Sequence, residues 1–214
     1  MKRQAWIAGA SGLVGQALVQ QLLVHPAYEQ VTAWGRRPLQ GADPGLIEVR
    51  WPQPQEAVPL LARRVDDGFC CLGTTLEKAG SRAAFTAVDL DLVVDFAHLC
   101  HAHGARRFVV ISAVGAAADS LSFYARTKGR MEAALARVGF DALHIVRPSL
   151  LLGARAESRW AEDLGQKIAP LIAPLLSGRL ARFRPVRAQD VAQAMLEVAQ
   201  RQDRGVEVHH LPLQ

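Results

Sequence analysis

Tyr124 and Lys128 are the residues whose types and spacing best fit proton transfer. They stand four apart in a segment that we expect to be helical, so their side chains are neighbours on one helix face. A free tyrosine titrates at about pH 10, but a nearby ammonium favours the phenolate and makes the hydroxyl more useful near neutral pH. Ser112 ends an upstream predicted strand, where its hydroxyl can donate to a carbonyl oxygen. The competing interpretation is an ordinary surface tyrosine and lysine stacked on a helix.

A glycine turn near the N-terminus, Gly9-Ala-Ser-Gly12-Leu-Val-Gly15, predicts a dinucleotide site. It follows a short apolar strand and leads into a segment whose apolar residues recur at helical spacing. A helix N-terminus presents unpaired N–H groups and partial positive charge, which together favour a phosphate. Glycine permits the turn, the close approach of a pyrophosphate and the tight packing of helix on strand. We therefore expect the cofactor to lie against Gly9, Ser11, Gly12, Leu13, Val14 and Gly15, although a purely structural turn can have the same sequence.

Two arginines at the end of the next predicted strand indicate which dinucleotide binds. An NAD-specific site usually places an acidic residue here, to accept from the ribose 2′-hydroxyl. This chain has Arg36 and Arg37 instead, whose charge and forked donors suit a 2′-phosphate. We therefore expect NADP(H), while a solvated arginine pair in a loop is the alternative.

Alternating strands and helices with short connections predict an α/β fold, a doubly wound parallel sheet of the Rossmann type. Strands are expected at 6–8, 31–34, 46–49, 69–72, 107–112, 142–152 and 206–211. Helices are expected after the glycine turn and at 60–64, 84–103, 124–138 and 188–201. The regularity falls after Gly153, so we expect residues 154–187 to form a small C-terminal substrate or lid segment.

Length and composition favour a single domain over residues 1–214. The chain has 214 residues, of which 50% are hydrophobic, enough to bury one substantial core. It has no apolar run of about 18 residues and starts directly with a strand, so we expect neither a membrane span nor a secretory signal. Three cysteines without a C-x-x-C motif fit a reducing compartment, and we expect the cytoplasm.

Two features could point to other kinds of function. The formal net charge is +5, but the basic residues are scattered and no nucleic-acid module accompanies them, so we expect no specific nucleic-acid partner. His98, Cys100, His101 and His103 crowd the end of a predicted helix. Only His98 and His101 share a face and no partner cluster lies elsewhere, so we expect no metal site.

The chain resembles the short-chain dehydrogenase/reductase superfamily in its atypical branch. The resemblance is carried, in the expected order, by the glycine turn, Ser112, Tyr124-Ala-Arg-Thr-Lys128 and Arg147-Pro148-Ser149. More narrowly, three stretches are similar to the oxidoreductase family that includes the human Tat-interacting tumour suppressor: Gly35-Arg36-Arg37, Cys70-Cys71-Leu72-Gly73-Thr74-Thr75 and Lys78-Ala79-Gly80. The resemblance covers residues 5–155 well and the remainder loosely.

This resemblance implies a Rossmann fold that binds NADP(H), with Ser112, Tyr124 and Lys128 as the reductase triad. It also implies that Lys128 contacts the ribose and that the stretch after Pro148 touches the nicotinamide end. The residues implied to line the cofactor next to the fourth strand are Gly73, Thr74 and Thr75. Close members of this family are better known as cofactor binders than as enzymes with an assigned substrate.

The sequence thus predicts an NADP(H)-dependent oxidoreductase acting on the carbonyl or alcohol group of a small molecule. The alternatives are a non-catalytic NADP(H)-sensing protein that docks a partner, and an epimerase or dehydratase with a tightly held cofactor. Arginines late in the chain indicate an anionic substrate, with solvated arginines on an edge strand as the alternative: Arg179, Arg182, Arg184 and Arg187. The oligomeric state stays open between monomer and homodimer.

Overall fold

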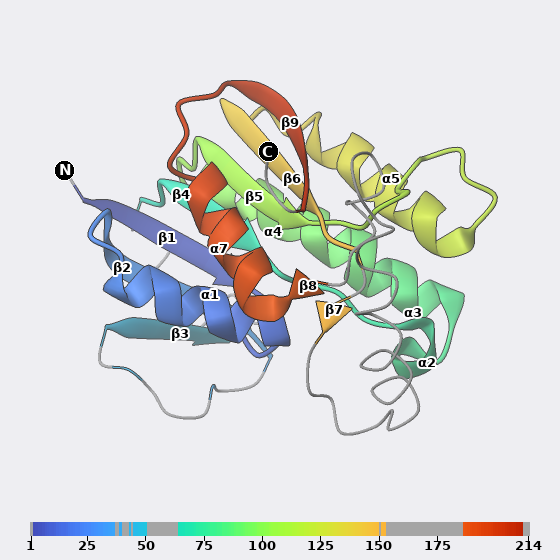
Figure 1. Cartoon of the computed structure of the whole chain (residues 1–214), viewed down its shortest axis with the longest axis horizontal. Helices are drawn as coiled ribbons and strands as arrows, with labels where there is room; N and C mark the ends of the chain where they lie inside the picture. The colour runs from blue at the N-terminus through green and yellow to red at the C-terminus, as the bar shows by residue number, and fades with distance from the viewer. Residues whose placement is uncertain are drawn as a thin grey trace, which may run out of the picture.

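A seven-stranded parallel sheet organises the chain in this computed structural model (Figure 1). The structure describes residues 2–36, 39, 43, 45–50, 64–149, 151–152 and 186–211. In spatial order the strands are β3 (Leu46–Arg50), β2 (Tyr28–Gly35), β1 (Arg3–Ala8), β4 (Asp67–Cys70), β5 (Arg107–Ile111), β6 (Ala142–Arg147) and β9 (Gly205–His210). All six neighbouring pairs are parallel, which confirms the predicted doubly wound Rossmann fold.

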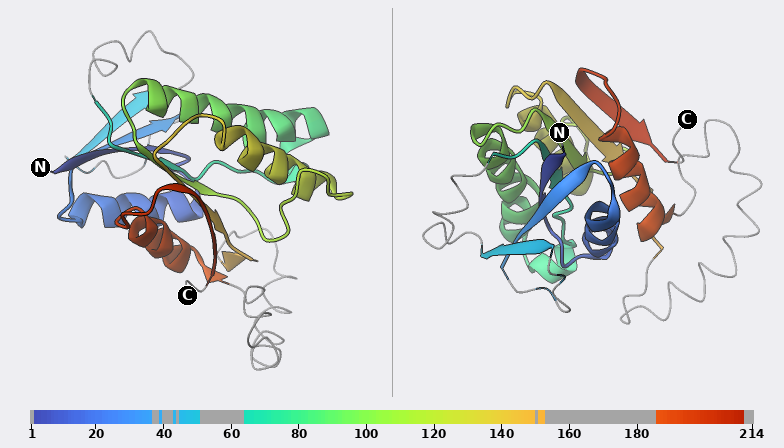
Figure 2. Two further views of the ribbon diagram at one scale, coloured as in Figure 1. Left: turned by 90° about the horizontal axis from the view of Figure 1, so that it is seen from above. Right: turned by 90° about the vertical axis from the view of Figure 1, so that its left-hand side faces the viewer.

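Helices cover both faces of this sheet (Figure 2). One face carries α1 (Leu13–Val24) and α7 (Ala188–Val198), and the other carries α4 (Leu92–Ala102) and α5 (Phe123–Leu135). Short segments precede α4 in the chain: α2 (Leu76–Ala79), α3 (Arg82–Thr86) and the π-helical segment η2 (Ala87–Asp91). Two further strands of two residues each, β7 (Leu151–Leu152) and β8 (Val186–Arg187), pair with each other in a separate sheet. None of the helices within these described ranges is long and apolar enough to cross a membrane.

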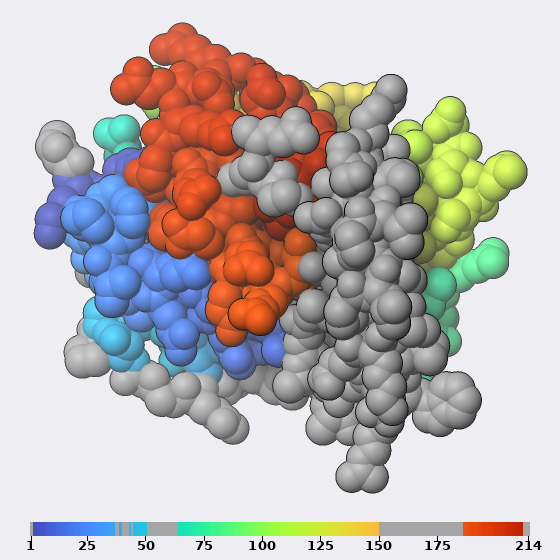
Figure 3. All heavy atoms as spheres, viewed as in Figure 1, coloured from blue at the N-terminus to red at the C-terminus, as the bar shows by residue number. Residues whose placement is uncertain are grey.

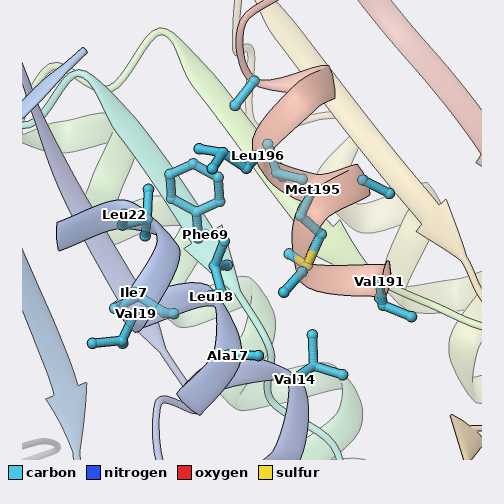
Figure 4. Packing of buried hydrophobic residues seen from close by; sticks show 14 of the residues in the cluster. Ile7, Val14, Ala17, Leu18, Val19, Leu22, Phe69, Val191, Met195 and Leu196 are labelled. Carbon is cyan, nitrogen blue, oxygen red and sulfur yellow. The ribbon is translucent and has the colours of Figure 1, made fainter. Parts of the chain in front are cut away.

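Strand β1 contributes to the core on both sides of the sheet, because its side chains alternate between the two faces. Ala5 and Ile7 pack with α1 and α7, whereas Trp6 and Ala8 pack with the layer that contains α4. On the first face Phe69 is fully buried where α1 and α7 meet (Figure 4). These two helices also lie side by side on the molecular surface (Figure 3). Each large apolar side chain buried in this way contributes about 1.5–3 kcal/mol to folding.

Three predicted elements differ from the observed ones for identifiable reasons. The predicted strand over 142–152 ends at Arg147, because Pro148 has no N–H to continue the ladder. The predicted helix over 84–103 is divided by η2. A π-helical turn holds more residues than an α-helical turn, and the periodicity of apolar residues in the sequence does not show this local change. The strand predicted over 69–72 lies two residues earlier, as β4. Apart from Arg64 and residues 186–187, the segments 60–64 and 154–187 lie outside the described residues, and the single domain stays a prediction.

A pair of buried histidines joins β6 to the edge strand β9. His144 Nδ1 and His209 Nε2 are 3.0 Å apart, so one ring donates its proton to the other. Burial, with smaller contributions from His209 and Arg107, lowers the pKa of His144 to about 4. Burial also lowers the pKa of His209. Both imidazoles are therefore neutral when the chain folds at neutral pH.

Acidification should destabilise the fold through His144. Its pKa is lower in the folded chain, so between about pH 6.5 and pH 4 the unfolded chain binds more protons, and the free energy of unfolding decreases as the pH is lowered. The loss attributable to one such histidine reaches at most about 1.4 kcal/mol per pH unit. Urea denaturation of the wild type and of His144→Gln across this range tests the assignment. Equal pH slopes for the two proteins would contradict it.

Candidate active site

A cavity of about 900 Å³ opens at the carboxyl ends of β1, β2 and β4. At this edge the chain leaves β1 for β2 on one side and leaves β4 for β5 on the other side, so the cavity lies at the strand-order switch that is the usual ligand crevice of a doubly wound sheet. The residues lining the cavity are Gly9, Ala10, Ser11, Gly12, Ala33, Trp34, Gly35, Arg36, Leu39, Glu48, Val49, Arg50, Cys71, Leu72, Gly73, Thr74, Lys78, Ala79, Ala84, Val88 and Leu92. The sequence-predicted glycine turn and the loop after β4 therefore border one space.

The turn after β1 requires glycine for two separate reasons. Gly9 has a φ of +82°, and a Cβ there would lie only 2.5 Å from the carbonyl carbon of Cys71 in the loop after β4. A Cβ on Gly15, in the first turn of α1, would lie 2.2 Å from the carbonyl oxygen of Gly9. The turn is therefore in backbone contact with the β4 loop on one side and with its own helix on the other.

The N-terminus of α1 offers open hydrogen-bond donors to this cavity. Its N-cap residue is Gly12, which has no side chain to cap the helix, and its first turn contains no acidic residue. The unpaired N–H groups and the partial positive charge of the helix therefore favour an anion at this position. Gly12 itself lines the cavity, whereas Leu13, Val14 and Gly15 lie behind it.

The far end of the cavity is formed by β2 and β3. Gly35 pairs with Arg50 in the parallel register, so Arg50 stands beside the residue that precedes Arg36, and both arginines line the cavity. Within the described part of its lining, Glu48 supplies the only carboxylate, and Glu48 Oε2 accepts a 2.9 Å hydrogen bond from the Leu39 N–H. Arg37 lies outside the described residues.

Lys128 is held by a buried ion pair at the wall of the cavity. Its ammonium lies 2.7 Å from Asp89 Oδ1, and both side chains are almost fully buried. Asp89 Oδ2 accepts a 2.8 Å hydrogen bond from the Thr74 N–H, which joins the pair to the loop after β4. A Cβ on Gly73 would lie 3.9 Å from Lys128 Nζ, so the ammonium lies next to a residue that lines the cavity.

The next residue, Gly129, brings α5 close to the loop that precedes it. A Cβ at position 129 would lie 2.2 Å from the carbonyl carbon of Ala117, in the long loop between β5 and α5. This loop can therefore lie directly on the backbone of α5.

Ser112 belongs to a second buried network and does not line the cavity. Its hydroxyl donates to Glu132 on α5, and Glu132 forms a two-bond ion pair with Arg147 at the end of β6. A carboxylate paired in this way only accepts hydrogen bonds, so the single hydroxyl proton of Ser112 is committed to it. In this arrangement that proton is not free for a substrate carbonyl, the role predicted from the sequence.

Tyr124 is the exposed member of the stripe Tyr124, Lys128 and Glu132, which are spaced four apart along α5. Its side chain is 40% exposed, and its ring lies 5.7 Å from the ring of Phe85, centre to centre. Phe85 sits between Ala84 and Val88, both of which line the cavity. Tyr124 itself is not among the lining residues, so the stripe borders the cavity rather than facing directly into it.

The remaining predicted residues lie near the site without lining it. Thr75 caps α2 by accepting a hydrogen bond from the Lys78 N–H, and the buried Pro148 accepts from the Val114 N–H. Sequence reasoning missed Asp89, Glu132 and Arg50, although Asp89 interrupts an apolar helix stripe and Glu132 lies one turn after Lys128. Among the described residues no three potential metal ligands gather, and the predicted absence of a metal stays a prediction.

Comparison with known proteins places the chain in a family. Its sequence matches the NAD dependent epimerase/dehydratase family over residues 5–212. The chain belongs to this family. Protein HTATIP2 of Rattus norvegicus is 36% identical over 77% of this chain and 69% of its own length. Protein FMP52, mitochondrial, of Candida albicans is 32% identical over 92% of this chain and 87% of its own. The recognition of the sequence as an atypical short-chain dehydrogenase/reductase is thereby confirmed.

Solved structures of lower sequence identity share the fold of this chain. MoeE5 in complex with UDP-glucose and NAD has a TM-score of 0.67 and 21% identity, over 96% of this chain and 75% of that one. UDP-glucose 4-epimerase from Thermotoga maritima has a TM-score of 0.70 and 14% identity, over 97% and 76%. Membership of the NAD dependent epimerase/dehydratase family supports a nicotinamide dinucleotide as the cofactor.

The predicted cytoplasmic location is contradicted by these comparisons. Fungal relatives from Candida albicans, Debaryomyces hansenii and Scheffersomyces stipitis are named as mitochondrial proteins. The prediction depended on three unpaired cysteines and on the start of the chain. Free thiols indicate a reducing environment but do not distinguish one reducing compartment from another.

Replacing Ser112 should affect folding more than cofactor binding. Ser112→Ala removes a hydrogen bond to a buried, charged acceptor, which is worth about 1.5–3 kcal/mol. Urea denaturation should show that loss, and calorimetric titration should show NADPH affinity within about twofold of wild type, since a 0.4 kcal/mol difference is about twofold. Ser120→Ala, in the exposed loop, is the matched control. An unchanged unfolding free energy for Ser112→Ala would contradict the network.

Proposed function

We propose that this chain is an NADP(H)-dependent oxidoreductase acting on the carbonyl or alcohol group of a small molecule. The observation that supports it most is the cavity at the β1–β4 crevice, which is lined by Gly12 at the uncapped start of α1 and by Gly73, the residue next to the Lys128 ammonium. An anion-binding helix end next to a proton-transfer pair is the combination that dinucleotide-dependent reduction needs.

The residues of the cavity fit a dinucleotide of this kind. The turn Gly9–Gly12 and the first N–H groups of α1 would hold the diphosphate, and Arg36, Arg37 and the neighbouring Arg50 would face a 2′-phosphate. Lys128 would contact the nicotinamide ribose, with Gly73, Thr74, Thr75 and Pro148 along the same side. The bound cofactor supplies or takes the hydride.

The chain's own part in the reaction is to hold the substrate and move a proton. In the reducing direction the Tyr124 hydroxyl would give its proton to the carbonyl oxygen as hydride adds to the carbonyl carbon, and water would reprotonate the phenolate. We further propose that residues 154–187 cover the substrate. Their arginines, with Arg187 at the described end, would suit a carboxylate or phosphate on it.

A second candidate, a protein that senses NADP(H) without turnover, is favoured by a specific observation. The Ser112 hydroxyl and the Lys128 ammonium, two of the three predicted catalytic groups, are each committed to a buried carboxylate. A panel of carbonyl substrates with NADPH separates the two functions. Consumption of NADPH supports the reductase, tight binding without consumption supports the sensor, and cofactor that co-purifies unconsumed supports epimerisation.

NADPH should bind more tightly than NADH. Charge-assisted hydrogen bonds to the 2′-phosphate contribute about 1.5–3 kcal/mol each, so we expect a preference of at least about tenfold. The double change Arg36→Ala with Arg37→Ala should remove the preference and leave NADH affinity nearly unchanged. Arg106→Ala, at the opposite edge of the sheet, is the control. Equal affinities for the two cofactors in calorimetric titration would instead favour a 2′-hydroxyl held by Glu48.

Tyr124→Phe should abolish turnover without affecting binding. The change removes one hydroxyl from a partly exposed ring, so folding and NADPH affinity should stay as in wild type. On any substrate found in the panel, kcat should fall by at least about a hundredfold, the usual size of a lost general acid. Phe123→Tyr, the neighbouring position, provides a matched control. A wild-type rate for Tyr124→Phe would contradict the assignment of the proton donor.

A further inference from the structure

The ion pair between Lys128 and Asp89 changes what the lysine can do for Tyr124. The two charged groups lie 2.7 Å apart, with side-chain exposures of 4% and 1%. Because both groups are buried, water and salt screen the interaction between the two charges very little. From one helical turn away, Tyr124 therefore faces a close pair of opposite charges rather than an isolated ammonium.

The other cations around the stripe, Arg82 and Arg126, are exposed or partly exposed, so solvent and salt screen their fields more than the field of a buried charge. Glu132, one turn beyond Lys128, is paired with Arg147. On α3, the Arg82 guanidinium lies over the ring of Phe123, 5.1 Å from its centre, at the exposed side of the helix. Asp91 on η2 is exposed. The buried charges nearest to Tyr124 along α5 thus belong to two internally neutralised pairs.

A nearby thiol already shows the two charges opposing each other. Burial raises the pKa of the Cys70 thiol to about 12, while Lys128 acts to lower this pKa and Asp89 acts to raise it. A group placed near both residues therefore receives opposite contributions from them.

We propose that Asp89 is a positioning residue that neutralises Lys128, so that the Tyr124 hydroxyl keeps its proton at neutral pH. If the proposed oxidoreductase function holds, on which this consequence rests, the hydroxyl acts as a proton donor and not as a base. The site would then be suited to reducing carbonyls: Tyr124 would give its proton to the carbonyl oxygen, and water would restore that proton. Bound NADPH would supply the hydride for the carbonyl carbon. Alcohol oxidation would need the phenolate, which the pair disfavours.

The composition of the chain makes this inference directly measurable. The chain has only two tyrosines, Tyr28 and Tyr124. Burial and the adjacent Asp67 carboxylate raise the pKa of Tyr28 far above its usual range. Phenolate absorbance that develops at alkaline pH, below the range in which Tyr28 ionises, therefore reports Tyr124 alone. Tyr124→Phe provides the blank that assigns the transition.

The test compares wild type and four variants, all without cofactor, by the midpoint of this absorbance transition. Asp89→Asn leaves the ammonium unpaired and should lower the midpoint by about one pH unit or more. Lys128→Met leaves the carboxylate unpaired and should raise it by a similar amount. The double variant removes both charges and should return the midpoint to within about 0.3 of wild type, a small part of the shift that one unpaired charge produces. Asp91→Asn, an exposed acid in the same segment, should change nothing.

The double variant decides the result even when a single variant fails to fold. Removing one partner of a buried pair costs about 3–5 kcal/mol, whereas replacing both with uncharged groups is often neutral. If the double variant keeps a midpoint well above wild type, Lys128 acts on Tyr124 alone and the proposal is wrong. An unchanged midpoint in a folded Asp89→Asn overturns it equally. Because no cofactor or substrate is present, this result is independent of the NADPH titration that tests the proposed function.

Discussion

The close backbone contact between the turn after β1 and the loop after β4 determines the geometry of the whole site. At Gly9 the two backbones are too close to admit even a methyl group. The carboxyl ends of β1 and β4 are therefore held together, while the chain crosses to opposite sides of the sheet on leaving them. The start of α1 and the Gly73–Thr74 loop consequently border the same cavity at a fixed spacing.

Two buried carboxylates extend this constraint to α5. Asp89 binds Lys128 and the Thr74 N–H, which joins α5 to the loop after β4. Glu132 binds Arg147 and Ser112, which joins the same helix to the ends of β6 and β5. Buried ion pairs give little net stability relative to apolar packing, but one broken pair is costly. Their effect here is to fix α5 in one position while its first turn, with Tyr124, stays partly exposed.

The sequence was sufficient to predict the sheet, the glycine turn and the tyrosine–lysine stripe, because each has a local pattern. A helix capped by glycine and a four-residue spacing are visible without knowing what packs against them. The partners of these residues were not predictable in the same way. The proximity of Arg50 to Arg36 follows only from the pairing of β2 with β3, and nothing local to Ser112 shows that its hydroxyl turns toward a helix twenty residues later.

Asp89 illustrates a different limit. In a regular helix an acidic residue among Phe85, Val88 and Leu92 interrupts the apolar face, and the periodicity alone gives no reason for it. The reason lies in a lysine and a backbone N–H from two other segments, which meet this carboxylate inside the protein. A charge at a core position is thus a useful signal, although its partner has to come from the fold.

Gly129 has a consequence for how α5 can vary among related sequences. The loop at Ala117 lies against the one position of this helix turn that lacks a side chain, so it fixes the rotation of the helix about its own axis. Rotation of the helix by one residue, about 100°, would bring a Cβ into the loop backbone. The same rotation would turn Tyr124 to another side of the helix. The glycine thereby fixes the direction in which Tyr124, Lys128 and Glu132 point around the helix axis. Replacement of these polar residues can change the chemistry next to the crevice, while the replacing side chains keep the same direction around the helix axis.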